Sequence, residues 1–308
     1  MSTSSFTVTA IVIQYGGGAV TAGLLEELRS DVVRTVIVVR NPRHPGDASA
    51  PCPVPGGELV TLPTNRGYGA AANEGRRRVA PAEGAFVVVL THDVDLEPGC
   101  LRALARALQA DNQLAIVGPV LREEDPESCI VGGRRSLIGH AARIAQRWPI
   151  PHRPGEVRSV DWIDGAAMMI RPGATPLFDE RYFLYVEELA VCLSVQPAFR
   201  VGVALDALAS QRSGATARPG AHGYLIVRNS LLLDAGLHGV VGVALGLVRT
   251  GATIGRQLVH VVSNHGPGRR FAWTQVVGMT WGAFDGVRGR IGPPPSPLQR
   301  GGDIANAS

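Results

Sequence analysis

The chain alternates short runs of apolar, β-branched residues with segments in which leucine and alanine recur at helical spacing. Such runs are typical of strands buried on both faces of a sheet. Strand, helix and strand joined by short links predict right-handed βαβ units, and so an α/β protein with a Rossmann-like, open, mostly parallel sheet flanked by helices. The expected strands are Thr7–Tyr15, Val33–Val39, Leu59–Leu62, Phe86–Leu90 and Leu114–Val120.

The run Phe86–Leu90 ends abruptly in a polar stretch that contains His92, Asp93 and Asp95. In open parallel sheets, ligands bind outside the carboxyl ends of the strands. If strand geometry continues past Leu90, Asp93 and Asp95 point to one side, as is needed to hold a hard divalent cation. The alternative is that these acids only cap the helix that is expected to begin near Pro98.

Two glycine-containing segments precede this strand. Gly16–Gly18 follows the first expected strand, where it lets the backbone approach a ligand closely. Asn65–Gly75 forms a turn that enters an alanine-rich helix, and the free N–H groups at a helix start favour an anion such as a phosphate. It is not a Walker sequence, and a plain helix start remains the alternative.

Composition narrows the class of protein. With 308 residues, 45% of them apolar, the chain can bury one large core or two small ones. A net charge of +4 suits anionic ligands or an anionic membrane surface, but it is too weak to indicate nucleic acid. Four cysteines without a CxxC pair, and no secretory signal, predict free thiols in a cytoplasmic protein.

The middle of the chain is expected to contribute a second half to the site. The basic segment Ser128–Glu156 reads as a flexible insertion over a substrate. Strand character returns at Val160–Ile170. Phe178–Glu188 then combines aromatic residues with four carboxylates before a helix from Leu189.

In this order, the segments resemble a family 2 glycosyltransferase with the GT-A fold, most closely the bacterial rhamnosyltransferase branch. The resemblance extends over Thr7–Leu233 and includes Arg228-Asn229. Its motifs are VTAIVIQYGG, NRGYGAAANEG, VVVLTHDVDLEPGCL, and VDWIDGAAMMIRP followed by LFDERYFLYVEEL.

The resemblance implies an inverting, metal-assisted transfer of a hexosyl or deoxyhexosyl group from a nucleoside-diphosphate sugar to an acceptor hydroxyl. Asp93 takes the place of the family's metal-binding aspartate for Mg²⁺ or Mn²⁺, with Asp95 as an extra carboxylate on the metal or the ribose. Glu188, the second member of the Glu187–Glu188 pair, takes the place of the general base. The acceptor would be a glycan, a lipid-linked molecule or a natural product.

The remaining candidate residues follow from the same motifs. Donor contacts are expected from Tyr15, Arg40, Asn41, Asn65, Gly67, Gly69, Asn73, His92, Asp93 and Asp95. Acceptor contacts are expected from Trp162, Asp164, Gly165, Ala166, Tyr185 and Glu187. For His92, Trp162 and Tyr185 a structural role is at least as common, because lone histidines and aromatic residues at strand ends often pack into the core.

Several positions depart from the family pattern. Arg40 replaces an aspartate that contacts the nucleotide base, and Thr91 replaces the first acidic or amide residue of the metal motif. Ala190, Ser194 and Gln211 replace an aspartate, an arginine and a later histidine, for which His222 is a substitute or only a solvent-facing loop residue. These losses leave a rival hypothesis, a paralogue that binds a nucleotide sugar or glycan without turnover. A nucleotidyltransferase would need a basic clamp near Gly16–Gly18, where none is found.

The expected domain plan is a GT-A domain at 1–223, with its donor half at about 1–120 and its acceptor half at 121–223, then a helical region at 224–291 and a disordered tail at 292–308. The helical region is rich in Leu, Val and Gly, with Arg228, Arg249 and Arg256 along it. It fits a helix lying on the inner face of the membrane, or a helical pair that packs under an acceptor lid or forms a dimer contact. We favour the packed pair because the arginines are few.

Overall fold

The computed structural model describes residues 6–44, 46–47, 51–79, 85–123, 125, 127–135, 142–211 and 218–300. Contacts divide the chain into a sheet unit, Met1–Arg135, Ala141–Glu180 and Glu187–Ser213, and a helical unit, Ser136–His140, Arg181–Val186 and Gly214–Ser308. The boundary between the sheet domain and the helical region was expected at 223/224, but it falls earlier. A helix starts at Pro219, where extended Arg218 and proline at the first helical position open it.

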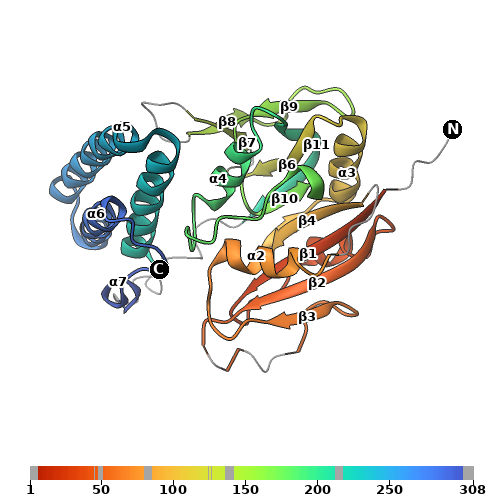
Figure 1. The fold of residues 1–308 in the computed structure, drawn as a ribbon, viewed down its shortest axis with the longest axis horizontal. Coiled ribbons are helices and arrows are strands. Elements are labelled where there is room, and N and C mark those ends of the chain that lie inside the picture. The colour runs from red at the N-terminus through yellow and green to blue at the C-terminus, as the bar shows by residue number, and fades with distance from the viewer. Residues whose placement is uncertain are drawn as a thin grey trace. The chain divides into compact units, whose positions relative to one another are not determined.

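Figure 1 shows the sheet unit as one twisted sheet flanked by helices. The strands along its main path are, in spatial order, β3 (Glu58–Thr61), β2 (Val33–Asn41), β1 (Thr7–Tyr15), β4 (Ala85–Thr91), β10 (Ala167–Ile170), β6 (Leu114–Arg122), β11 (Arg200–Gln211) and β5 (Val94–Leu96). Off this path, β7 (Ser128–Arg134) pairs with β6 and with β8 (Ala142–Arg147), and β9 (Val157–Val160) pairs with β11.

Strands β3, β2, β1 and β4 are parallel to one another, as are β6 and β11. Strand β10 runs antiparallel to both β4 and β6 and joins the two groups. The predicted open, mostly parallel α/β sheet is therefore confirmed. In the parallel register Tyr15 pairs with Asn41 and Ile13 with Thr91, so the carboxyl ends of β1, β2 and β4 meet at one edge.

The helices pack on both faces of the sheet because alternate residues of each strand point to opposite sides. Val8, Ala10 and Val12 of β1 share a core with α1 (Ala22–Glu27) and α3 (Cys100–Ala110). On the other face, α2 (Tyr68–Arg76) lies against Ile11. A Cβ on Gly75 would come within 2.5 Å of the Ile11 side chain, so glycine permits this close contact.

Two sequence predictions are corrected here. The segment 128–156 was expected to be a flexible insertion, but Ser128–Arg134 and Ala142–Arg147 within it pair as antiparallel strands β7 and β8, and β7 extends the sheet beside β6; residues 136–141 lie outside the described chain. The expected strand Val160–Ile170 is two short strands, β9 and β10, separated by a loop. β9 pairs with β11 while β10 fits between β4 and β6, so residues 161–166 cross from one strand to the other. The four cysteines are free thiols, as expected.

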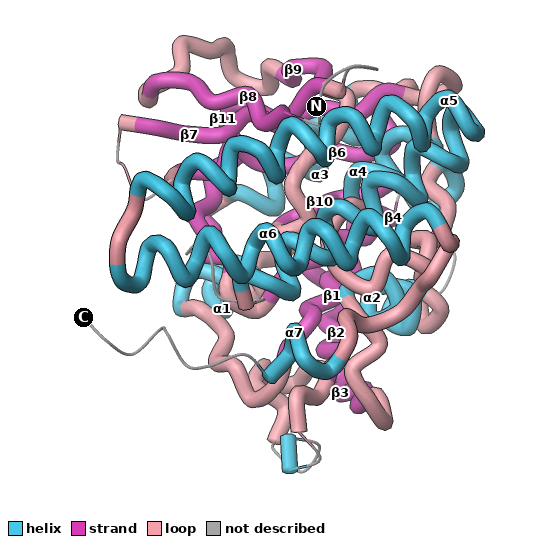
Figure 2. Tube along the Cα trace, turned by 90° about the vertical axis from the view of Figure 1, so that its left-hand side faces the viewer, coloured by secondary structure: helices cyan, strands magenta, loops and turns pink. Residues whose placement is uncertain are grey.

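The helical unit contains α5 (Pro219–Ser263), α6 (Gly266–Val287) and α7 (Ser296–Arg300). Figure 2 shows α5 and α6 running side by side. By length and composition α5 could cross a membrane, because an 18-residue window within it has a mean hydropathy of 1.9, although non-helical Gly239 divides the helix. The expected disordered tail is corrected at its start: α7 forms, and the Gly292 carbonyl accepts a hydrogen bond from Arg228. Residues 301–308 lie outside the described chain.

Candidate active site

The turn after β4 places Asp93 at the carboxyl edge of the sheet. Its Oδ1 atom accepts a hydrogen bond of 3.2 Å from Nε2 of Gln211, the last residue of β11, and the same amide lies 3.3 Å from the Thr91 hydroxyl. Gln211 stands where the resemblance has a histidine. The structure therefore brings this position to Asp93 across 118 residues of sequence, and an amide oxygen there has the chemistry of a hard-cation ligand.

Asp95 does not share a partner with Asp93. A turn at His92-Asp93 interrupts the strand, and Oδ1 of Asp95 accepts the Gly23 N–H at 2.9 Å, at the start of α1. A carboxylate at a helix N-terminus is stabilised by the helix dipole. The expectation that both acids point to one site is thus corrected, and Asp95 has a structural explanation.

His92 and Arg40 lie near the glycine loop after β1, but they differ in exposure. The half-buried His92 ring is so close to Gly18 that a Cβ there would come within 2.5 Å of two ring atoms. Arg40 is 0% exposed, with Nε on the Gln14 amide oxygen at 2.8 Å and Nη2 on the Pro51 carbonyl at 2.7 Å. The expected donor contact of Arg40 is corrected, because its guanidinium binds β1 and a loop instead. Tyr15, also half-buried, ends β1 at the same edge.

The amide side chains of Asn41 and Asn65 hold the loop before α2 in place, and most of the residues predicted to bind the donor here are buried. Asn41 is buried, donating to the Gly67 carbonyl at 3.1 Å and accepting the Arg66 N–H at 2.9 Å. Asn65 accepts the Gly67 N–H at 2.9 Å. Gly67 has φ of 86°, a conformation that favours glycine, and Gly69 is buried against Phe178. Of these four predicted donor residues, only Asn65 is partly exposed.

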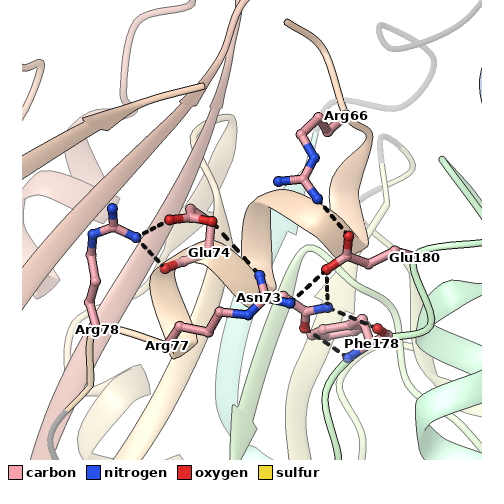
Figure 3. Close-up of polar contacts among 7 residues, drawn as sticks. All are labelled: Arg66, Asn73, Glu74, Arg77, Arg78, Phe178 and Glu180. Carbon is pink, nitrogen blue, oxygen red and sulfur yellow. Dashed lines mark hydrogen bonds and ion pairs between the residues drawn. The ribbon is translucent and has the colours of Figure 1, made fainter. Parts of the chain in front are cut away.

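Asn73 joins α2 to the Phe178–Glu180 segment (Figure 3). Its amide donates to the Phe178 carbonyl at 2.9 Å and to Glu180 at 3.0 Å, and its Oδ1 accepts the Phe178 N–H at 2.8 Å. Asn73 is 1% exposed, so its expected donor contact is corrected to an internal bridge. Arg66 and Arg77 complete the network through Glu180 at 2.8 and 3.0 Å.

We expect Asn73→Ala to lower the free energy of unfolding by about 1–3 kcal/mol, because it leaves two buried backbone groups of Phe178 without partners. The matched control is Arg77→Ala in the same network, whose exposed ion pair with Glu180 should contribute less than about 1 kcal/mol. Urea denaturation measures both. Equal losses in the two variants would contradict the bridging role of Asn73.

The loop between β9 and β10 connects the Asp93 turn to Glu188. The Ala166 carbonyl accepts the Thr91 N–H at 2.9 Å, next to the Asp93 turn. The neighbouring Gly165 carbonyl accepts the Tyr68 hydroxyl at 2.6 Å, and a Cβ on Gly165 would lie 3.7 Å from the Cβ of Glu188. Thus Asp93 and Glu188 lie on either side of one short loop, at the same edge of the sheet.

Asp164 and Ala166 hold this loop in place. Asp164 accepts Nη2 of Arg143 at 2.6 Å and the Ala166 N–H at 3.1 Å. Asp164 and Gly165 remain partly exposed, whereas Ala166 is buried. Trp162 is also buried, with its ring against Gly133, where a Cβ would come within 2.1 Å of the indole. The expected acceptor contact of Trp162 is therefore corrected to core packing.

The two glutamates at the start of α4 (Glu187–Ser194) have different environments. Glu187 is 3% exposed, and its Oε2 atom has no hydrogen-bond partner among the described residues. Burial raises the pKa of Glu187 well above its usual range, and the neighbouring charge of Glu188 raises it further. Glu188 is half-buried. The structure thus encloses Glu187, where burial favours its protonated form, and leaves the second carboxylate nearer the surface. The expected acceptor contact of Glu187 is corrected because its side chain is enclosed.

Glu187 should make the protein less stable as the pH rises. Between pH 4.5 and its raised native pKa, the native state keeps a proton that the unfolded state has released, so the free energy of unfolding falls through this window. We expect Glu187→Gln to remove this slope, as seen by urea denaturation over a pH series. Glu26→Gln, on the exposed side of α1, should keep it. Identical slopes in wild type and Glu187→Gln would refute the prediction.

Within the helical unit, Asn229 of α5 holds the loop that leads in sequence to Glu187. Its amide donates to the carbonyls of Leu184 and Tyr185 at 2.8 and 2.7 Å, and Arg228 donates to its Oδ1 atom. In this loop Tyr185 and Val186 have φ of 68° and 76°. A positive φ is a strained backbone conformation for a β-branched residue such as Val186. Sequence reasoning noted Arg228-Asn229 only as part of a resemblance and missed this role.

His222 and Tyr185 also belong to the helical unit. The Tyr185 ring packs edge-on against His222, with ring centroids 4.9 Å apart. His222 lies on α5 rather than in a solvent-facing loop, which corrects that expectation. Tyr185 is partly exposed, so a contact with an acceptor remains a prediction.

The polar groups around Asp93 fit a cation that is held mainly by a substrate. No group of three or more His, Cys, Asp or Glu that could hold a metal occurs in the described part of the chain. Mg²⁺ commonly uses one or two protein carboxylates together with substrate phosphates and water. Asp93 provides one such carboxylate, and the Gln211 amide beside it faces Asp93 through its NH2 group. A surface hollow of about 440 Å³ near Glu127 and Arg147 contains none of these residues.

Comparison with known proteins supports the motif-based resemblance. No family model matches the chain. Two curated relatives from Mycobacterium tuberculosis, strains CDC 1551 / Oshkosh and ATCC 25618 / H37Rv, are 28% identical over 160 residues, and both are named N-acetylglucosaminyl-diphospho-decaprenol L-rhamnosyltransferase. The match covers 44% of this chain and 52% of each relative, so the chain spans about half their length. The resemblance to the rhamnosyltransferase branch is thereby confirmed.

Among solved structures, the chain is similar to the crystal structure of S. aureus TarS 1-349 in complex with UDP-GlcNAc. The TM-score is 0.45 and the sequence identity 13%, over 92% of this chain and 93% of that one. A likeness this distant gives no information about individual residues of the site.

Proposed function

We propose that this protein is an inverting glycosyltransferase that moves a hexosyl or deoxyhexosyl group from a nucleoside-diphosphate sugar to an acceptor hydroxyl. The similarity to two named rhamnosyltransferases supports the class of reaction. The observation that carries the proposal is the contact chain from the Asp93 turn through Ala166 and Gly165 to Glu188. It supports a site with one carboxylate for the leaving group and another for the nucleophile.

In this proposal Glu188 takes the proton of the acceptor hydroxyl. The hydroxyl oxygen then forms a bond to the anomeric carbon as the bond to the diphosphate breaks, and the electron pair leaves with the diphosphate. Attack from the side opposite the leaving group inverts the anomeric configuration. A protonated Glu187 suits this role for Glu188, because two adjacent carboxylates are not both easily ionised in a buried position.

Asp93 is proposed to face the diphosphate. When bound, Mg²⁺ or Mn²⁺ would offset the negative charge that develops on the departing nucleoside diphosphate. Asp93 would hold it, the Gln211 NH2 group would orient the Asp93 carboxylate, and the loop at Asn65–Gly67, with N–H groups at the start of α2, would orient the phosphates. Tyr15 and His92, both partly exposed at this edge, remain proposed donor contacts.

We propose a lipid-linked acceptor, by analogy with the relatives whose name specifies an N-acetylglucosaminyl-diphospho-decaprenol. Glycan and natural-product acceptors remain part of the test. We also propose that the protein works in the cytoplasm.

The proposal is tested with the purified full chain and a panel of nucleoside-diphosphate sugars, with Mn²⁺ or with EDTA. A donor that binds the native state should raise the melting temperature by mass action. Metal-dependent release of nucleoside diphosphate, accelerated by an acceptor, would support the transferase. A melting shift without any release or transfer, over the whole panel of acceptors, would instead favour the rival paralogue that binds without turnover.

A further inference from the structure

The second half of α5 and all of α6 form a helical arm with few partners. Gly239, with φ of 59° and ψ of −141°, ends the first segment of α5, and the chain then folds back, so that Arg249 pairs with buried Asp234. On α6, glycines at every fourth position pack against the backbone of the first segment of α5; these are Gly278, Gly282 and Gly286. The first segment is therefore enclosed, whereas residues 240–263 are packed on one side only.

Most of the large hydrophobic side chains that are exposed in the described chain belong to this arm. Of fifteen such side chains, twelve lie within 240–263 and α6, two more lie beside the arm at Leu237 and Ile291, and the remaining one is Leu177. Val240 is 86% exposed and Val262 81%. On α6, the exposed residues include Phe271, Trp273 and Phe284. Such a concentration marks a surface that another apolar phase covers, since scattered exposure would not gather on two helices.

The charges of the arm select the partner. Residues 235–291 contain six arginines and a single acid, Asp285, and they contain no lysine. Asp285 is buried and accepts the Tyr224 hydroxyl at 2.7 Å, and Arg249 is paired internally. Arg290 is exposed but also pairs with Asp285, at 3.4 Å. Arg256, Arg269 and Arg270 in the arm are exposed, as is Arg288 just after α6, whose guanidinium lies 3.6 Å from the centre of the Phe284 ring. The arm therefore presents positive charge beside aromatic and aliphatic side chains.

An anionic lipid surface fits this combination better than a second copy of the chain. A two-fold dimer contact brings the same patch of both copies together, so the arginines would face arginines. A single transmembrane span is also disfavoured, because Gly239 divides α5 and Arg249 and Arg256 interrupt its second segment. Interfacial helices combine an apolar face that includes aromatic residues with arginines that reach anionic headgroups.

We propose that the arm formed by residues 240–263 and α6 is a docking surface for an anionic lipid bilayer, with the apolar side chains at the level of the headgroups. The helices do pack as a pair, as the sequence led us to expect. Only the preference against a membrane contact, which rested on the small number of arginines, is reversed. The inference does not depend on the proposed transfer reaction, because binding to vesicles is measured without donor or acceptor.

The test is co-sedimentation of the full chain with vesicles of phosphatidylcholine alone or mixed with phosphatidylglycerol. We expect binding to the anionic vesicles, and a loss of about tenfold or more in Arg269→Glu/Arg270→Glu. Trp273→Ser/Phe284→Ser should also lose binding, about tenfold or more. Far-UV circular dichroism confirms that each variant is folded.

Two matched controls separate a local surface from general effects. Leu177→Ser removes an exposed apolar side chain of the sheet unit. Arg29→Glu/Arg106→Glu changes the net charge as much as Arg269→Glu/Arg270→Glu does, but at exposed positions just after α1 and on α3. Both should bind vesicles like wild type. Equal binding to neutral and anionic vesicles, no binding to either, or equal losses in the controls would overturn the proposal. So would a dimer, seen by sedimentation velocity, that Trp273→Ser/Phe284→Ser dissociates.

Discussion

Glu188→Gln should lower the rate of sugar transfer by about 10² to 10⁴-fold while leaving donor binding nearly unchanged. The amide is almost the same size as the carboxylate but cannot take the proton of the acceptor hydroxyl, and general base catalysis contributes about this factor. Glu188 is half-buried beside Gly165, and because the amide has almost the same size as the carboxylate, the substitution creates no cavity there. Rates are measured at saturating donor and acceptor, and donor affinity by the melting shift.

The neighbouring Glu187→Gln is the contrast for this variant. Because burial raises the pKa of Glu187 and favours its protonated form, an amide is a close substitute there and should reduce the rate far less. If Glu187→Gln lost as much activity as Glu188→Gln, with both proteins folded, the assignment of the base to Glu188 would be wrong. Unchanged transfer by Glu188→Gln would lead to the same conclusion.

Asp93→Asn should lower transfer at least about a hundredfold and should also weaken the metal-dependent binding of nucleoside diphosphate. Among the described residues, the Asp93 carboxylate accepts one hydrogen bond, of 3.2 Å from Gln211. The fold should therefore tolerate the change to asparagine. The measurements are transfer rates and melting shifts with nucleoside diphosphate, each in Mn²⁺ and in EDTA.

Asp95→Asn is the matched control, two residues along the same turn. Its carboxylate binds the N-terminus of α1, so the expected effect is a loss of about 0.3–1 kcal/mol in the free energy of unfolding, with little change in transfer. Equal loss of metal-dependent binding in both variants would restore the original hypothesis that the two carboxylates hold one cation. No loss in Asp93→Asn would remove Asp93 from the site.

Local sequence patterns predicted the positions of β1, β2, β3, β4 and β6, but they missed β11, which pairs with β6. The expected Thr7–Tyr15 strand is β1 as observed, and the expected Phe86–Leu90 strand lies within β4. These runs are buried on both faces, so their β-branched composition alone distinguishes them from amphipathic helices. The same patterns failed at Ser128–Glu156, where pairing with β6 organises a polar, arginine-rich segment into a hairpin.

The site divides in the same way. Motifs placed Asp93 and the two glutamates at sheet-edge positions, but burial distinguished Glu187 from Glu188, and a distant partner distinguished Asp95 from Asp93. The amide side chain of Asn73 is of a type that often contacts ligands. Only its hydrogen bonds to Phe178, 105 residues away, show that it joins α2 to the Phe178–Glu180 segment.

By itself the sequence determined the class of fold, the positions of several of its strands and the acidic turn, because each depends on neighbouring residues and on the preference of apolar runs for a buried sheet. Only the tertiary structure decided which polar side chains are enclosed and which remain accessible, and that the apolar side chains of α5 and α6 are left exposed. Burial depends on contacts between segments far apart in the chain, and no local pattern of residues specifies those contacts.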